Sequence, residues 1–191
     1  MAKREVQLVV PAVRLHWQHR LCQSCGAACK AHSRKVRLLS DDRGFRSAPD
    51  PENPGWHTWQ LSDATRFNSW MFPQLLVRRD DDGKARLRMF PEHRHTNLAD
   101  NVHGGTVLAL IDIALFACSR MLGIIEAGTA VTLDLSVQFI GAAKPGQPCD
   151  AVTELLKETR RLVFLRGIVE QDGSGLIAAF SGTIRKPTAP R

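Results

Sequence analysis

The longest apolar run in the sequence lies between residues 106 and 122, where hydrophobic residues recur on every face of a helix. A helix that is apolar all round is expected inside a core instead of on a surface. Gly104 and Gly105 open the run, Arg120 stands in its last turn and Gly123 follows it, which is typical of helix ends. The pattern predicts one long buried helix.

Segments with alternating side chains predict β-strands on both sides of this helix. Residues 130–140 alternate most regularly. Their apolar set is Val131, Leu133, Leu135, Val137 and Phe139, and their polar set is Thr132, Asp134, Ser136 and Gln138. Further strands are predicted at residues 75–79, 85–90, 149–157, 162–170 and 176–186. In the second of these, Arg86 and Arg88 alternate with apolar residues, which predicts one solvated face.

The order of the elements predicts the fold class. Two strands precede the apolar helix and four follow it, and a short helix capped by Ser62 or Asp63 is expected over residues 64–71. A long antiparallel sheet around a single helix explains both the uniform hydrophobicity of the helix and the alternation of the strands. We therefore expect an α+β fold, in which a curved antiparallel sheet wraps around one long buried helix.

One acid, Asp112, stands inside the apolar helix. An unpaired buried carboxylate costs several kcal/mol, so Asp112 is either protonated, hydrogen-bonded for structure, turned toward a partner chain, or catalytic. The other end of the helix favours catalysis, because a Gly-Gly helix N-terminus presents backbone N–H groups to a developing oxyanion. His103 and Asn97 stand just before it.

The spacing of these residues predicts an assembly. Gly104 and Asp112 are eight positions apart, or about 12 Å along a helix axis, which is too far for both to contact one carbonyl group. Two antiparallel helices related by a two-fold axis would bring Asp112 of one subunit to His103 and Gly104 of the other. We therefore expect a homodimer or a dimer of dimers, which is a homotetramer.

A family resemblance is carried by residues 94–105, which read R-H-T-N-L-A-D-N-V-H-G-G and are followed by an acid nine positions after the second histidine. The sequence here resembles the hot-dog-fold acyl-CoA thioesterases of the phenylacetate-pathway type. Asn97, His103, Gly104 and Asp112 match that family's pattern position by position. The resemblance implies the hot-dog fold, thioester hydrolysis and an active site shared between subunits.

The resemblance also implies a role for each matching residue. Asp112 acts as general base or nucleophile, the Gly104 N–H polarises the thioester carbonyl, and Asn97 and His103 orient water or support the loop. Thr132 stands where the family often carries a hydroxyl near the catalytic centre, although strand propensity explains a threonine there equally well.

Substrate binding is expected to use cations, because coenzyme A carries several phosphates. The cations at predicted turns or strand ends are Arg160, Arg161, Arg185 and Lys186, and we expect some of them, together with Gly105, to bind acyl-CoA. Phe67, Trp70 and Leu108 are candidates for contact with a fatty or an aryl acyl group. No cofactor and no metal is expected.

Charge divides the chain unevenly. The net charge is +7, yet residues 1–50 hold ten Lys/Arg against four Asp/Glu, whereas residues 51–191 hold sixteen against fifteen. We predict a basic, disordered extension over residues 1–55, the hot-dog domain over residues 56–187 and a tail over residues 188–191. The D-P-E-N-P-G linker pattern at residues 50–55 marks the first boundary. Neither nucleic acid nor a membrane is expected as a partner.

The extension contains Cys22, Cys25 and Cys29, with three histidines nearby. This cluster fits a zinc site in part, but no second ligand pair appears, so thiols in a tail are favoured. Five cysteines without framework spacing are typical of a reducing compartment, which predicts a cytoplasmic protein. A mitochondrial-type presequence is the alternative, since the first forty residues hold eight Lys/Arg and one acid.

Two other functions stay open. A hot-dog dehydratase or hydratase is the nearest enzymatic alternative, although its Asp-x-Asn-Pro-x-His type of motif is absent from the sequence. A non-catalytic acyl-CoA-binding protein is the other alternative. Asp112 discriminates between an enzyme and a protein that only binds acyl-CoA, because pure binding requires no acid in an apolar helix.

Overall fold

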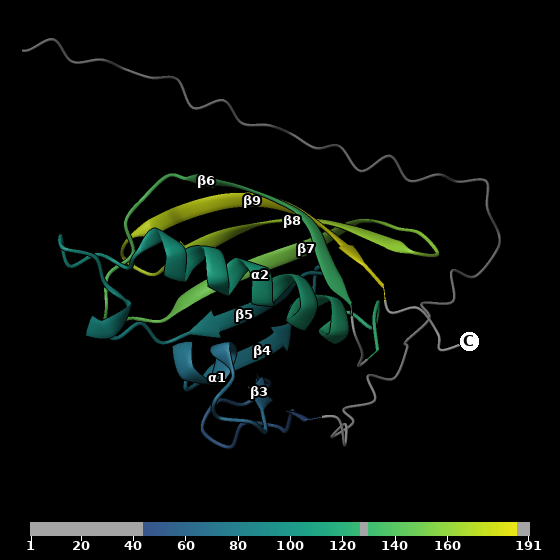
Figure 1. Cartoon of the computed structure of the whole chain (residues 1–191), viewed down its shortest axis with the longest axis horizontal. Helices are drawn as coiled ribbons and strands as arrows, with labels where there is room; N and C mark the ends of the chain where they lie inside the picture. Colours follow the sequence, from purple (N-terminus) through teal and green to yellow (C-terminus); the bar gives the residue numbers. More distant parts are fainter. Residues whose placement is uncertain (1–43, 127–129, 187–191) are drawn as a thin grey trace, which may run out of the picture. The chain divides into compact units, whose positions relative to one another are not determined.

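The computed structural model describes residues 44–126 and 130–186. A seven-stranded antiparallel sheet, in the order β2-β4-β5-β7-β8-β9-β6, curves around helix α2 (Gly104–Met121), as Figure 1 shows. The strands of this sheet are β2 (His57–Thr58), β4 (Leu75–Arg79), β5 (Ala85–Met89), β6 (Val131–Phe139), β7 (Cys149–Glu158), β8 (Leu162–Gln171) and β9 (Gly175–Arg185). The predicted fold class is therefore confirmed.

The long elements lie where the hydrophobic pattern predicts them, whereas the two-residue strands and the 3-10 turn were missed. Strands β1 (Phe45–Arg46) and β3 (Gln60–Leu61) form a separate two-stranded sheet, and η1 (His93–His95) is a single turn of 3-10 helix. Such short segments show no periodicity in the sequence. The pairing of β1 with β3 places ordered structure before the boundary expected at residue 55, whereas residues 1–43, which contain the three cysteines, lie outside the described residues.

The short helix α1 (Phe67–Met71) starts later than expected, and the proposed caps were wrong. Its N-cap is Arg66, which makes no side-chain cap hydrogen bond. The Asp63 carboxylate instead accepts hydrogen bonds from the backbone N–H (2.9 Å) and the hydroxyl (2.6 Å) of Thr65, closing a turn ahead of the helix. The exposed fractions of Phe67 and Trp70 are 56% and 67% in the described chain.

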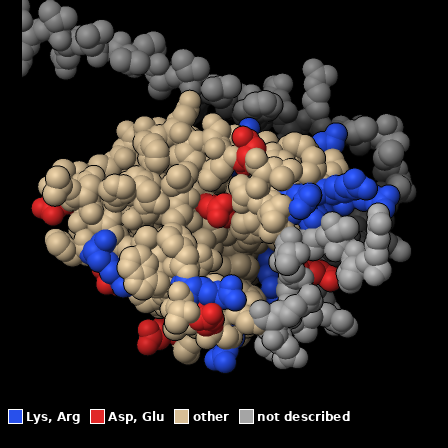
Figure 2. All heavy atoms as spheres, in the orientation of Figure 1, with Lys and Arg blue, Asp and Glu red and all other residues tan. Residues whose placement is uncertain are grey.

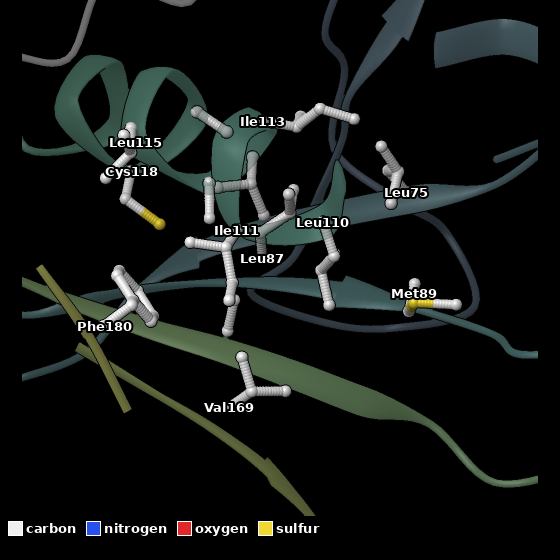
Figure 3. Close-up of a cluster of buried hydrophobic side chains, with 14 of the residues drawn as sticks. Leu75, Leu87, Met89, Leu110, Ile111, Ile113, Leu115, Cys118, Val169 and Phe180 are labelled. Atoms are coloured by element: carbon white, nitrogen blue, oxygen red, sulfur yellow. The ribbon is translucent and has the colours of Figure 1, made fainter. Parts of the chain in front are cut away.

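Most of α2 is buried against the concave face of the sheet. Its side chains meet those of β4, β5, β8 and β9 in one apolar cluster, which includes Leu87, Leu110, Ile111, Val169 and Phe180 (Figure 3). By length and composition α2 is the one described helix that could cross a membrane, but its residues are mostly buried inside the domain.

The sequence predicted that every face of α2 is buried, but one face is partly exposed. The residues of α2 that are not fully buried include Gly105, Leu108, Asp112, Phe116 and Arg120, which are spaced by three or four positions. Such spacing places them on one side of the helix, and we call them the open stripe. The stripe contains the acid and one of the two glycines singled out by the sequence.

Strand β6 contains a β-bulge that changes which way its side chains face. Thr132 pairs with Ile184 and Asp134 pairs with Thr183, so Leu133 is an extra residue on the β6 side. A bulge of this kind reverses the alternation beyond it. Thr132 therefore faces α2 together with Leu135, although simple alternation predicted that it shares a face with Asp134.

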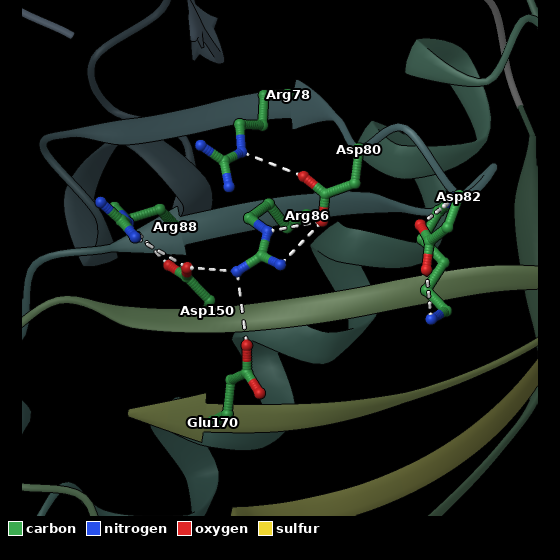
Figure 4. Close-up of polar contacts among 8 residues, drawn as sticks. Arg78, Asp80, Asp82, Arg86, Arg88, Asp150 and Glu170 are labelled. Atoms are coloured by element: carbon green, nitrogen blue, oxygen red, sulfur yellow. Dashed lines mark hydrogen bonds and ion pairs between the residues drawn. The ribbon is translucent and has the colours of Figure 1, made fainter. Parts of the chain in front are cut away.

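The other face of the sheet carries an ion-pair network (Figure 4). Arg86 contacts Asp80 at 2.7 Å, Asp150 at 3.1 Å and Glu170 at 3.3 Å, while Arg88 contacts Asp150 at 2.7 Å. Asp150 is buried, and its hydrogen bond raises the pKa of Arg88. The interpretation of Arg86 and Arg88 as solvated side chains was therefore wrong, since both are committed to acids on neighbouring strands.

Candidate active site

The N-terminus of α2 is organised by His103. This N-cap residue is extended (φ −63°, ψ 138°), and its Nδ1 accepts a hydrogen bond of 2.9 Å from the Gly105 N–H. The N–H groups of Thr106 and Val107 donate to the His103 carbonyl oxygen at 2.9 and 3.2 Å. Among the first N–H groups of the helix, that of Gly104 has no acceptor within the described residues. A free N–H at a helix N-terminus can hydrogen-bond a ligand oxygen.

An aromatic ring lies against this glycine. A Cβ added to Gly104 would stand 3.5 Å from two ring carbons of Phe139, the last residue of β6. Phe139 is 57% exposed in the described chain, so its ring lies at the surface beside the free N–H. An oxygen bound by Gly104 would therefore have an apolar wall on one side.

The loop before the helix is held by Asn97. The Oδ1 of Asn97 accepts hydrogen bonds from the N–H groups of Ala99 (2.9 Å) and Asn101 (3.3 Å). Asp100 adopts a left-handed φ of 54°, which such a tight turn requires. Leu98 projects fully into solvent. An open depression on the outside of this loop is lined by His93, Arg94, Thr96, Asn97, Leu98, Ala99, Asp100 and His103.

Asp112 lies in the middle of the open stripe and is hydrogen-bonded to β6. The Thr132 hydroxyl donates to Asp112 Oδ1 at 2.7 Å, and Oδ2 has no partner among the described residues. The contact exists because the bulge at Leu133 turns Thr132 toward the helix. Asp112 therefore keeps one carboxylate oxygen available at a partly exposed position.

The predicted residues form two separate groups in one chain. Asn97, His103 and Gly104 lie together at the start of α2, and Asp112 and Thr132 lie together further along it. Gly104 and Asp112 are separated by two turns of α2, about 12 Å. A single chain therefore does not bring the N–H donor and the acid to one substrate atom.

The four predicted cations lie at one end of the sheet. Arg160 and Arg161 are in the β7–β8 turn, and the Lys186 N–H donates to the Arg161 carbonyl oxygen at 2.8 Å. Arg185 pairs with Val131, the neighbour of Thr132, and the ammonium of Lys186 pairs with Glu158. Figure 2 shows Lys and Arg side chains gathered where the β7–β8 hairpin projects in Figure 1, whereas the face over α2 is mostly uncharged.

Two buried cysteines of the described chain are expected to be unreactive, because their thiols stay protonated. Cys118 on α2 and Cys149 on β7 are buried, and burial raises the pKa of each thiol to about 12. Cys118 therefore packs as a small apolar side chain. No group of three or more His, Cys, Asp or Glu side chains arranged to hold a metal occurs in residues 44–126 and 130–186.

The sequence interpretation missed His95. Its ring is 2% exposed and both ring nitrogens are hydrogen-bonded. The signal in the sequence was its place in the H-T-N run, two residues before Asn97.

Comparison with known proteins is consistent with this geometry. The family model of the thioesterase superfamily matches residues 99–178, which include Gly104, Asp112 and Thr132. No curated protein shows a significant match to the sequence.

Solved structures share the fold over nearly two thirds of the chain. A mutant of the phenylacetic acid degradation protein PaaI from Thermus thermophilus has a TM-score of 0.52 and 26% identity, covering 63% of this chain and 98% of that one. The PaaI protein of E. coli has a TM-score of 0.51 and 18% identity, with coverage of 60% and 80%. A hypothetical thioesterase from Streptococcus pneumoniae, solved with coenzyme A, has a TM-score of 0.53 and 18% identity, with coverage of 61% and 88%.

Proposed function

We propose that this chain, whose residues 99–178 match the thioesterase superfamily model and whose sheet and helix have the hot-dog arrangement, is an acyl-CoA thioesterase with an active site shared between two subunits. The observation that carries the proposal is the pairing of two features on one helix. The free Gly104 N–H provides an oxyanion donor, and the Thr132-bound carboxylate of Asp112 provides a base or nucleophile. We place the enzyme in the cytoplasm.

The chemistry uses the two groups on opposite sides of the thioester carbonyl. The Gly104 N–H donates to the carbonyl oxygen as it gains negative charge. In one version Asp112 takes a proton from a water that attacks the carbonyl carbon, and the CoA thiolate leaves and is protonated. In the other version the Asp112 carboxylate attacks the carbonyl carbon and displaces the CoA thiolate, which is then protonated, and water hydrolyses the resulting mixed anhydride to regenerate the carboxylate and release the free acid. His103 and Asn97 support both versions by fixing the loop and the helix cap.

A second copy of the chain supplies the missing half of each site. The separation of about 12 Å along α2 excludes joint action of Gly104 and Asp112 within one chain. Strand β6 is an edge of the sheet, and it exposes Leu133 and Phe139, while Leu108 is exposed on the open stripe. Exposed apolar residues along an edge strand and a helix are typical of a subunit interface.

The substrate class follows from the two surfaces beside the acid. The cations at the end of the sheet near Thr132 fit the phosphates of coenzyme A, and the Streptococcus pneumoniae protein, which has a similar fold, was solved with coenzyme A. Exposed Phe67, Trp70 and Leu108 offer apolar contacts for the acyl group. The proposed acyl group is a fatty or an aryl chain.

The decisive experiment measures thiol release from short, long and aryl acyl-CoAs by the wild type and by Asp112→Ala. We expect hydrolysis of at least one substrate and a loss of at least about a hundredfold in the variant, as is typical when a positioned base is removed. The matched control is Asp81→Ala, which removes an exposed carboxylate from the β4–β5 turn.

The other outcomes are equally informative. Wild-type turnover by a folded Asp112→Ala protein would refute the mechanism. Tight acyl-CoA binding without hydrolysis, unchanged in Asp112→Asn, would identify a binding protein. Hydration of an enoyl-CoA would identify the hydratase alternative.

A further inference from the structure

His95 connects α1 to the part of the chain that presents Gly104. Its ring is buried beside Phe72, with 6.0 Å between ring centroids and an interplanar angle of 16°. Nδ1 accepts a 2.8 Å hydrogen bond from the Glu92 N–H, so the proton of the ring must be on the other nitrogen. Nε2 then donates to the Met71 carbonyl oxygen at 2.7 Å. The ring is held as one neutral tautomer with both nitrogens in use.

The backbone of His95 reaches the helix cap directly. Its carbonyl oxygen accepts a hydrogen bond of 2.8 Å from the His103 N–H and a weaker one of 3.4 Å from the Thr106 hydroxyl. His103 in turn caps the helix through the Gly105 N–H. A continuous line of hydrogen bonds therefore runs from the last residue of α1, through His95 and His103, to the N–H next to that of Gly104.

We propose that His95 is a positioning residue, which sets the direction of the free Gly104 N–H by fixing the His103 backbone against α1. This inference rests on the proposed function, since it concerns the oxyanion donor of that site. The physical reason is that a hydrogen-bond donor stabilises an oxyanion only when it points at the place where the charge develops. Nothing else in the described residues ties α1 to the helix cap through hydrogen bonds to a single side chain.

Three substitutions separate the contributions of the ring. His95→Asn keeps an acceptor near the position of Nδ1 for the Glu92 N–H, and His95→Gln keeps a donor near the position of Nε2 for the Met71 carbonyl. His95→Phe keeps the stacking on Phe72 and loses both hydrogen bonds. We expect kcat to fall about tenfold or more in His95→Phe with KM within about twofold, and to be partly restored by His95→Gln or His95→Asn.

The second measurement does not depend on catalysis. Hydrogen exchange of the Gly105 amide, followed by NMR, reports the His103 cap directly. We expect this amide to exchange at least about tenfold faster in His95→Phe than in the wild type. The matched control is Leu76→Ala, a destabilising change at a fully buried residue that pairs with Arg88 on the opposite face of the sheet. It should lower the melting temperature without changing kcat or Gly105 exchange.

The results discriminate clearly. If His95→Phe behaves like Leu76→Ala, with kcat per folded molecule and Gly105 exchange unchanged, the proposal is overturned. If the wild type hydrolyses no thioester, the proposed function fails, and faster Gly105 exchange would still show that His95 positions the cap.

Discussion

The two halves of the proposed site lie on one helix and are held in opposite ways. At the start of α2 the polar groups of His103 and Asn97 are bonded within the loop, and the Gly104 N–H is left without an acceptor in the part of the chain that the structure describes. Asp112 is supported by one hydrogen bond from Thr132 among the same residues. The donor is thus fixed before substrate arrives, while the acid keeps an oxygen and partial exposure for a second subunit and a water. The N–H donor is therefore oriented by contacts within its own chain, whereas in the proposed dimer the open carboxylate oxygen of Asp112 would serve the site completed by the other subunit.

The largest effect on activity is expected when Asp112 and the Gly104 N–H are each removed from a different subunit of the proposed dimer. Asp112→Ala and Gly104→Pro should each lower turnover by about a hundredfold or more, since the first removes the carboxylate and the second removes the free N–H. Proline fits there, because it favours the first position of a helix and because His103 already has the extended conformation preferred before proline. Coexpression of the two variants should restore about a quarter of the wild-type activity, since about half of the dimers are mixed and each of those carries one intact site of two.

The control for this experiment is each variant mixed with itself, which must stay inactive. Light scattering should show a dimer or a dimer of dimers. Mixtures that remain inactive although the variants assemble, or a fully active monomer, would contradict the shared site.

The support of Asp112 can be weakened without touching the acid. Thr132→Val removes the hydroxyl that donates at 2.7 Å and should lower kcat about tenfold, equivalent to about 1.4 kcal/mol. Thr132→Ser keeps the hydroxyl and should retain most of the activity. Equal kinetics of the valine and serine variants would show that the threonine is present only for its strand propensity.

The geometry of the N-terminus of α2, where His103 caps the helix, can be tested by substituting its two adjacent glycines. At Gly105 a Cβ would stand 3.0 Å from Nδ1 of His103, whereas at Gly104 it would meet the Phe139 ring at an ordinary 3.5 Å. Gly105→Ala should therefore displace the cap and lower kcat about fivefold, and Gly104→Ala should stay within about twofold. Steady-state kinetics decide this, and a larger loss in Gly104→Ala would contradict the free space beside that residue.

The smallest effect concerns the buried side of the same helix. Burial raises the pKa of Cys118 to about 12, so its thiol stays protonated at pH 9. Iodoacetamide at pH 9 should leave the Cys118 peptide unmodified in the folded protein and label it in denaturant. Mass spectrometry measures the labelled fraction of that peptide in the folded and the denatured protein. Rapid labelling of the folded protein would show that the Cys118 face of α2 is exposed, as the Asp112 face is.

Periodicity explains which parts of the fold were predictable. The helix at residues 104–121 and the strands from Leu75 onward have enough residues for a repeat of 3.6 or 2 to be visible. The bulge at Leu133 is invisible to this reasoning, because one extra residue changes the facing of Thr132 without altering the composition of the strand. The sequence thus predicted that Thr132 is near the acid only through the family resemblance.

The sequence identified most residues of the candidate site, but it did not reveal which of them are buried or what they contact. Asp112 attracted attention because an acid is unusual in an apolar helix, and the two glycines because they open that helix. The open stripe was missed, since the sequence alone does not distinguish an apolar helix residue at a partly exposed position from one that faces the core. His95 was missed because a single 3-10 turn gives no pattern from which burial can be inferred.

The segment around β1 decides where the chain can be shortened. The Phe45 ring lies 4.2 Å from that of Trp59 and 4.5 Å from the Arg120 guanidinium at the end of α2, and the Thr58 N–H donates to the Ala48 carbonyl. A cut at residue 55 would strip this covering from the last turn of the core helix, although the sequence there looks like a linker. A crystallisation or expression trial should therefore keep residues 44–55 with the domain.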